Sequence, residues 1–308
     1  MTNPAGALRR PIGRRFLLCA IPAALVAGSL RAQQRSEVRA IVADDGPATR
    51  LAVDALKQRI PTLTVVQKER PPLRRSNTLA LAIGPAALQA ALDDNGDGPV
   101  MSLFSSQSTF NRLAGASPSG ARRISAIFAE AAPEAQFQLI RALFERKVAV
   151  GVLLSDATAH LEARLERGAR RHDLELKIHR VAPGANVVRE LNVLVASDVL
   201  LALPDPSLYN GSTLPSLLDS AYRRGKPLIG FSASFVEAGA LAAAIATAED
   251  VAAQVQDALA DPDPSRLPEP AHPLYWRVVI NEQVARSLNV PIADSVRALG
   301  NRPSAKGR

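Results

Sequence analysis

The sequence predicts an α/β protein with two parallel sheets, each covered by helices. Apolar runs of strand length alternate with amphipathic stretches of helix length along most of the 308 residues, which is typical of parallel strands with right-handed crossovers. The repeats fall into two successive sets of four or five, which indicates two sheets rather than one. The alternation is too regular for a helix bundle, and a TIM barrel needs eight continuous units.

The first set of repeats follows a strand expected early in the chain. The five expected strands are residues 38–43, 63–67, 79–83, 99–104 and 124–129. Helices are expected over 48–59 and 86–93, and Pro85 suits the start of the second because its missing N–H costs nothing there. Only a short segment joins the second expected strand to the third, so we expect an abbreviated crossover and a reduced first lobe.

The second set of repeats is clearer. Its helix over 134–146 places Phe137, Ile140 and Phe144 on one stripe. The other expected elements are strands at 148–154, 174–181, 199–203 and 227–231, helices at 157–171 and 213–224, and capping boxes at 234–237 and 247–250.

The C-terminal part begins with a segment, 261–273, that contains five prolines and predicts an extended linker. A late strand over 274–280 and a helix over 281–288 follow, which fits a chain that returns to an earlier lobe. The small, polar and basic residues 295–308 predict a disordered tail.

The N-terminus has the pattern of a secretory signal. Arg14 and Arg15 precede a broken apolar run that ends at Leu30, and Ala32 suits cleavage. We therefore expect a cleaved signal peptide over 1–32 and a periplasmic protein, with an uncleaved anchor as the alternative. The arginine pair leaves export by the Sec or the twin-arginine route open. Cys19 is the sole cysteine, so a mature chain has no disulfide, thiolate nucleophile or cysteine metal site.

The net charge of +8 comes mostly from the expected signal. Residues 1–32 hold five arginines and no acid, and removing those five charges from +8 leaves +3. A charge of +3 spread over a whole protein is not the footprint of a nucleic-acid binder, so we expect no nucleic-acid partner.

One segment of the second set carries a family resemblance. It reads Asp-Val-Leu-Leu-Ala-Leu-Pro-Asp-Pro-Ser-Leu-Tyr-Asn-Gly-Ser-Thr over 198–213 and continues as Arg-Arg-Gly-Lys-Pro-Leu-Ile-Gly-Phe-Ser-Ala-Ser-Phe over 223–235. With Ala-Ile-Gly-Pro-Ala-Ala at 82–87 and Val-Ile-Asn-Glu-Gln-Val-Ala-Arg-Ser-Leu at 279–288, it resembles the ABC-type substrate-binding protein family of the tryptophan/tyrosine type.

The resemblance implies a type I periplasmic binding fold: two Rossmann-like lobes joined by a three-segment hinge, with a ligand cleft between them. By that likeness lobe 1 is 36–124 plus 247–271, and lobe 2 is 125–246 plus 272–294. It also implies a small-molecule ligand and an ABC permease in the inner membrane as partners.

Candidate ligand residues follow from where ligands bind in parallel α/β sheets, beyond the carboxyl ends of the strands and near helix N-termini. The candidates that occupy such loops are Asp44, Gly84, Pro85, Ser105, Ser106, Ser155, Asp205, Asn210, Thr213, Ser232 and Ser234. Each could instead have a purely structural role, as a helix cap or a turn residue. For Asp205, we expect Asp205→Ala to remove a ligand response while leaving the unliganded melting temperature nearly unchanged.

The sequence offers no catalytic constellation. Its four histidines lack metal-ligand spacing, and no nucleophile elbow, P-loop or full dinucleotide fingerprint is present. We therefore predict no catalytic residue, metal or cofactor, and a solute-binding component of an ABC importer. The alternatives are an envelope ligand-sensing or scaffold protein that regulates a signalling partner, an enzyme on the same fold, and a lobe pair that binds nothing.

Overall fold

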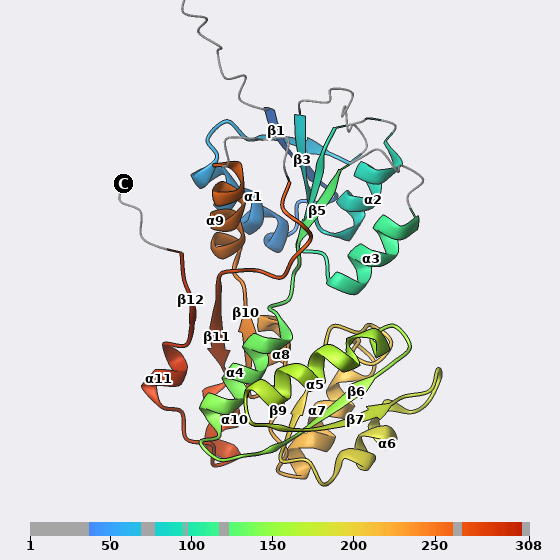
Figure 1. The fold of residues 1–308 in the computed structure, drawn as a ribbon, viewed down its shortest axis with the longest axis vertical. Coiled ribbons are helices and arrows are strands. Elements are labelled where there is room, and N and C mark those ends of the chain that lie inside the picture. Colours follow the sequence, from blue (N-terminus) through green and yellow to red (C-terminus); the bar gives the residue numbers. More distant parts are fainter. Residues whose placement is uncertain are drawn as a thin grey trace, which may run out of the picture. The chain divides into compact units, whose positions relative to one another are not determined.

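The computed structural model describes residues 37–68, 78–94, 96, 98–116, 123–260 and 267–303. The expected signal peptide therefore lies outside the described residues. The described residues from Glu37 to Pro303 form one compact unit that contains two sheets (Figure 1). Across the described part, no helix combines the length and the apolar character needed to cross a membrane.

The first sheet is wholly parallel, with strand order β2-β1-β3-β4-β5. Its strands are β1 (Glu37–Val42), β2 (Thr64–Gln67), β3 (Thr78–Ile83), β4 (Val100–Leu103) and β5 (Ile124–Ile127). Every residue of β3 is buried, because helices cover both faces of the sheet. Fully covered parallel strands are continuously apolar, as the sequence of β3 is.

Each face of this sheet has its own helix pair. One face packs against α1 (Pro47–Arg59) and α9 (Ala248–Leu259), which lie side by side in Figure 1. The other face packs against α2 (Pro85–Asp93) and α3 (Gln107–Ala116). We call this sheet and these four helices lobe 1. Helix α9 thus joins lobe 1 although it follows most of the second sheet in the chain.

The second sheet has strand order β12-β11-β10-β9-β8-β6-β7. Its parallel strands are β6 (Ala149–Leu154), β7 (Glu175–Arg180), β8 (Val199–Leu201), β9 (Leu228–Ile229) and β10 (Ala242–Ile245). Two antiparallel strands, β11 (Trp276–Ile280) and β12 (Gly300–Asn301), complete one edge.

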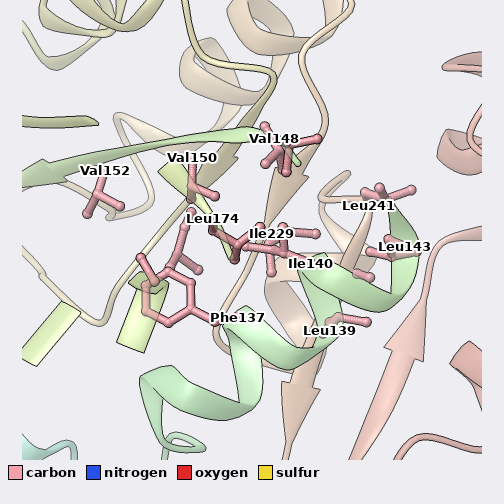
Figure 2. Close-up of a cluster of buried hydrophobic side chains, with 14 of the residues drawn as sticks. Phe137, Leu139, Ile140, Leu143, Val148, Val150, Val152, Leu174, Ile229 and Leu241 are labelled. Carbon is pink, nitrogen blue, oxygen red and sulfur yellow. The ribbon is translucent and has the colours of Figure 1, made fainter. Parts of the chain in front are cut away.

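Helices also cover both faces of the second sheet, and together they form lobe 2. One face carries α4 (Pro133–Leu143), α5 (Glu162–Arg171), α10 (Glu282–Ser287) and α11 (Asp294–Arg297). The stripe predicted on α4 points Phe137 and Ile140 into this core, where Phe137 lies near Leu174 and Ile140 lies near Ile229 of β9 (Figure 2). The other face carries α6 (Val187–Glu190), α7 (Leu214–Arg223) and α8 (Ala233–Glu237). Two 3₁₀ turns, Ala159–Leu161 and Leu191–Leu194, precede α5 and follow α6.

Three segments connect the lobes: 128–132, 246–247 and 267–275. The first and third are hydrogen-bonded to each other, since Phe128 N–H donates to the carbonyl of Ala271. Residues of the first also pair with the end of β10, through a bridge between Glu130 and Ile245. The sheets and these crossings are the two-lobed, three-segment architecture expected from the sequence.

Three details differ from the sequence prediction, and one agrees with it. The lobe boundary expected at 124/125 cuts β5, whose whole length pairs with β4. The strand β10 was not expected, because small residues over 242–244 give a weak strand signal. The capping box expected at 234–237 is absent, since Ser232 is the residue that caps α8. The box at Thr247 and Asp250 is present as predicted.

The expected disordered tail is wrong over its first part. Residues 294–297 form α11, and 300–301 form β12, which pairs with β11. Val296 is 1% exposed, and the side-chain amide of Asn301 donates to the carbonyl of Leu274. A polar and basic composition therefore misled the prediction, because one buried valine and one edge-strand pairing order this segment. Residues 304–308 lie outside the described part.

Candidate functional site

Each lobe has a cavity at the carboxyl ends of its strands, where the chain order reverses within the sheet. In lobe 1 the first strand, β1, has β2 on one side and β3 on the other. The lobe-1 cavity, about 400 Å³, follows β1 and β3 and is lined by Asp44, Thr49, Gly84, Pro85 and Phe104, among others. Such a reversal is where open α/β sheets bind ligands.

Lobe 2 repeats this geometry. Its first strand, β6, lies between β7 and β8. The lobe-2 cavity, about 520 Å³, is lined by residues that follow all three strands: Ser155 and Asp156 after β6, 181–186 after β7 and Ser207 after β8. The start of α7 completes it through Ser212, Thr213 and Ser216.

A further hollow of about 610 Å³ lies between 142–146 and 291–293. It borders the loop that enters β6, so it lies at the amino end of that strand and away from the strand-end loops. Its position does not match the ligand position of parallel α/β sheets, and we do not assign it to the candidate site.

In lobe 1, Asp44 closes the loop that precedes α1. Its Oδ1 accepts hydrogen bonds from Gly46 N and Thr49 Oγ1, both at 2.8 Å. The backbone bond from Gly46, followed by the bond from Thr49, lowers the pKa of this carboxyl. Asp44 therefore borders the cavity as an anion with one oxygen committed to the helix start.

Backbone conformation is unusual at two positions of the lobe-1 cavity. Gly84 has φ of +84° where the chain turns from β3 into α2, and Pro85 starts that helix. Phe104 has φ of +60° directly after β4. Left-handed backbone strains a bulky aromatic residue, and such strain gathers at functional sites. Phe104 was not among the sequence candidates, since backbone conformation is invisible in the sequence.

The two serines after β4 have different environments. Ser106 Oγ accepts from Thr109 N at 3.2 Å and donates to Thr109 Oγ1 at 2.9 Å, so it caps the first turn of α3. Ser105 is 1% exposed, and its Oγ has no hydrogen-bond partner among the described residues. Of the two candidates, Ser105 alone keeps an uncommitted hydroxyl.

In lobe 2, Asp205 holds two strand-end loops together. Its Oδ2 accepts from Ser155 Oγ at 2.6 Å and from Thr158 Oγ1 at 2.9 Å, and its Oδ1 accepts from Ser207 N at 3.0 Å and Ser207 Oγ at 2.6 Å. Burial alone raises the pKa of Asp205, but the bonds from Ser155, Ser207 and Thr158 outweigh it and lower the pKa. The carboxylate is 2% exposed and fully hydrogen-bonded.

The other lobe-2 candidates also have local partners. Asn210 Oδ1 accepts from Ser212 Oγ at 2.6 Å and from the N–H groups of Ser212 and Thr213. Thr213 Oγ1 donates to the carbonyl of Leu208 at 2.7 Å. Ser232 Oγ caps α8 by accepting from Phe235 N, and it lies 3.1 Å from Ser234 Oγ. These residues shape the loops of the site, in the structural roles of cap and turn residue.

Three aromatic rings cluster beyond β8 and β9. Tyr209 lies 6.2 Å from Phe231 and 5.8 Å from Phe235 between ring centroids, and the two phenylalanines are 4.9 Å apart. Burial first, and then the nearby charge of Asp205, raises the pKa of Tyr209. Tyr209 is therefore a neutral side chain; Tyr209 and Phe231 are both partly exposed, and Phe235 is the buried ring of the cluster.

The first crossing segment brings a group of charged residues that sequence reasoning missed. Glu130 is 8% exposed, and its Oε1 accepts from Gln107 N at 2.9 Å. Its carbonyl lies 3.2 Å from His272 Nδ1, and Arg164 Nη1 lies 3.0 Å from His272 Nε2. Arg164 also forms a two-bond ion pair with Glu134. A lone acid in an apolar segment after a strand was the available signal for Glu130.

The tautomer of His272 follows from its partners. A carbonyl only accepts hydrogen bonds and a guanidinium only donates them, so Nδ1 carries the proton and Nε2 accepts from Arg164. Burial, with the charge of Arg164 adding to it, lowers the pKa of His272 to about 4. The ring is therefore neutral at physiological pH. No cluster of three or more metal-ligating side chains exists among the described residues.

Comparison with solved structures places the fold. A substrate binding protein with adhesive properties from Clostridium difficile, in its ligand-free open form, matches 84% of this chain and 97% of its own, with a TM-score of 0.64 and 14% identity. An ABC domain in complex with L-Trp from Streptococcus pneumoniae matches 87% and 99%, with a TM-score of 0.57 and 16% identity. The chain has the type I periplasmic binding protein fold.

A conserved domain protein from Vibrio cholerae shares this fold with a TM-score of 0.56, 18% identity, and coverage of 86% of this chain and 98% of its own. No protein-family model matches the chain, and no curated protein sequence is significantly similar to it. At these identities the type I periplasmic binding protein fold is what is shared, and the site has to be argued from its own residues.

Proposed function

We propose that this protein is the periplasmic solute-binding component of an ABC importer, which closes its two lobes over a small solute and presents it to an inner-membrane permease. The observation that carries the proposal is the position of the two cavities. Each lies at the reversal point of its sheet, where open α/β sheets receive ligands.

The lining of the lobe-2 cavity favours a small polar solute such as an amino acid. Ser155, Ser207 and Ser212 line it with hydroxyl groups that already donate to Asp205 or Asn210, so they meet a solute as hydrogen-bond acceptors. The ten-residue helix α7 starts at the wall of the cavity. Leu214 N–H at this helix start already donates to the Asn210 carbonyl and Pro215 has no N–H, so the helix dipole is the feature that favours a carboxylate here. Val181, Val187 and Leu208 line the same cavity and offer apolar surface to the rest of the solute.

Two further lines support an exported solute-binding protein of the ABC type. The N-terminal sequence has the pattern of an export signal, and the segment 198–235 resembles ABC-type substrate-binding proteins. Of the structures with the same fold, one is a substrate binding protein and another is an ABC domain in complex with L-Trp. A bacterial importer requires such a component outside the inner membrane, and fractionation of expressing cells tests the periplasmic location.

A thermal-shift screen tests solute binding. We expect one class among the twenty L-amino acids, simple amines, monosaccharides and small organic acids to raise the melting temperature of the purified protein. A ligand at a hundredfold its Kd adds about 2.7 kcal/mol, which is about 5–10 °C for a protein of this size. If none of the four sets of compounds raises the melting temperature, the proposal is contradicted.

A cavity-filling variant tests the site. Ser216→Trp places a large ring in the lobe-2 cavity from an exposed position on α7, and we expect it to abolish the shift. Asp219→Trp is the matched control, since Asp219 is an exposed residue of the same helix that does not line the cavity. An unchanged shift in Ser216→Trp would exclude this cavity from the site.

A further inference from the structure

Glu130 has one carboxylate oxygen that the fold leaves without a partner. The residue is 8% exposed and lies in the first crossing segment, between β5 and α4. Its Oε1 accepts the N–H of Gln107 at 2.9 Å, whereas Oε2 is buried with no hydrogen-bond partner among the described residues. A buried carboxylate oxygen without a hydrogen-bond partner destabilises the folded state, and a ligand that supplies the partner is one explanation for it.

No neighbouring side chain can neutralise Glu130 within the described part of the chain. His272 is committed, because Nδ1 donates to the Glu130 carbonyl and Nε2 accepts from Arg164. Arg164 is held by the carboxylate of Glu134 through two hydrogen bonds. Gln136 uses both ends of its amide on the backbone of Ala244. Each of these polar groups around the hinge therefore has its own partner.

A small cavity opens beside Glu130, and we call it the hinge cavity. Its volume is about 20 Å³, which is enough for a single group the size of a water molecule. The strand-end residues of both lobes contribute to it, with Gln107 after β4, Pro204 after β8 and Phe231 after β9. The hinge cavity therefore lies among loops that follow strands of both sheets, the region where open α/β sheets bind ligands.

The chemistry of the hinge cavity selects one kind of group. A primary ammonium matches its size, supplies hydrogen-bond donors to Oε2 and cancels the buried charge. The ring of Phe231 adds a favourable aromatic wall for a cation. A planar guanidinium exceeds the volume, and a neutral hydroxyl leaves the charge uncompensated. We propose that Glu130 is the anchoring carboxylate for the primary ammonium group of the solute, which rests on the proposed function and narrows it to amine-bearing solutes.

The electrostatics of the unliganded site agree with this assignment. Burial raises the pKa of Glu130, and the hydrogen bond from Gln107 opposes that rise only in part. The fold therefore holds this carboxylate at a cost in the absence of a cation. Binding sites commonly sacrifice stability in this way, so the proposal predicts that removing the charge stabilises the free protein while it weakens binding.

The test compares matched ligands on the natural protein. L-Phenylalanine, phenethylamine and 3-phenylpropanoate differ only in whether they carry an ammonium or a carboxylate, and similar sets extend the comparison to L-leucine and L-lysine. We expect the hits of the solute screen to carry a primary ammonium, and we expect calorimetry to show at least a tenfold weaker Kd for the deaminated partner. Hits confined to sugars or organic acids overturn the Glu130 assignment and leave solute binding intact.

The variant Glu130→Gln separates binding from structure. Glutamine has the same shape and still accepts the N–H of Gln107, but it cannot cancel an ammonium charge. We expect Glu130→Gln to weaken the amine ligand at least tenfold and to raise the unliganded melting temperature at pH 7. Glu145→Gln, at an exposed acid just beyond the end of α4, is the control and leaves both values unchanged. Unaltered amine affinity in Glu130→Gln refutes the assignment, and no hit in any solute class refutes it together with the proposed function.

Discussion

Replacing Asp205 by alanine tests whether this carboxylate organises the lobe-2 loops. In the structure it joins the loop after β6 to the loop after β8 through four hydrogen bonds, with Ser155, Thr158 and Ser207 as donors. The sequence alone predicts that Asp205→Ala spares the unliganded melting temperature. The hydrogen bonds replace that expectation with a substantial loss of stability.

The size of the loss follows from which donors water can reach. Ser207 is exposed, so its two groups find water and cost little. Thr158 is 1% exposed and Ser155 is half-buried, and each donor left unsatisfied out of water costs about 1–3 kcal/mol. We expect the two donors, Ser155 and Thr158, to lower the free energy of unfolding by about 3 kcal/mol together, which lowers the melting temperature by about 6–12 °C.

Urea denaturation and thermal melting of Asp205→Ala measure this loss. Asp219→Ala removes an exposed carboxylate that pairs with Arg223 and is the control, with an expected change within about 0.5 kcal/mol. The lowered pKa of Asp205 adds a pH signature: its contribution is present above the unfolded value near 4 and is lost as pH falls through the folded value. A melting temperature within about 2 °C of the natural protein at pH 7 refutes the loop-organising role.

Two other predictions concern residues in or next to the crossing segments. Asp250 has a fully buried side chain that caps α9 and pairs with Arg277 of β11. Asp250→Ala should therefore lower the free energy of unfolding, measured by urea denaturation, by about 3–5 kcal/mol, and the double variant with Arg277→Leu should recover part of that loss. If the losses of the two single variants simply add in the double variant, the pairing is contradicted. The pKa of His272 is lowered to about 4, so the native state resists protonation and stability should fall, by up to about 3 kcal/mol, as pH drops from about 6.5 to 4. His272→Gln should flatten this dependence of stability on pH. The comparison is made in the Glu130→Gln background, because the pKa of Glu130 is raised and its protonation stabilises the protein as pH falls. An unchanged dependence on pH contradicts the lowered pKa of His272.

The alternation of apolar runs and amphipathic stretches was enough to predict two sheets built mainly of parallel strands and the return of the chain to an earlier lobe, but not the antiparallel pairing of β11 and β12. It failed where the strand signal depends on packing rather than on side-chain type. Strand β10 consists of Ala242, Ala243, Ala244 and Ile245, and alanine favours helices in isolation. The strand forms because it lies between β9 and β11 and buries all four residues. Such tertiary pairing cannot be read from local composition.

Strand-end positions were also predictable, and this is why Asp44, Gly84, Ser155 and Thr213 all line one of the two strand-end cavities. The hydrogen-bond partners of the side chains at these positions were not predictable. The sequence shows that Asp205 follows a strand, but not that three hydroxyl-bearing residues on two loops occupy both of its oxygens. It shows Glu130 after another strand, but not that Gln107 reaches only one oxygen.

Whether a side chain already has its hydrogen-bond partners within the protein decides which residues we expect to bind the solute. A polar group that already has its partners gains little from a ligand, because binding must first break existing hydrogen bonds. A buried group that lacks partners gains its full hydrogen-bond energy when the ligand arrives, and the fold has already met the desolvation cost. Glu130 and Ser105 are buried and lack a partner for one side-chain oxygen among the described residues, and their segments touch, since Ala129 N–H donates to the Ser105 carbonyl. The strongest contacts to a solute should therefore form beside the first crossing segment, while Asp205, Asn210 and Ser232 hold the loops that surround it.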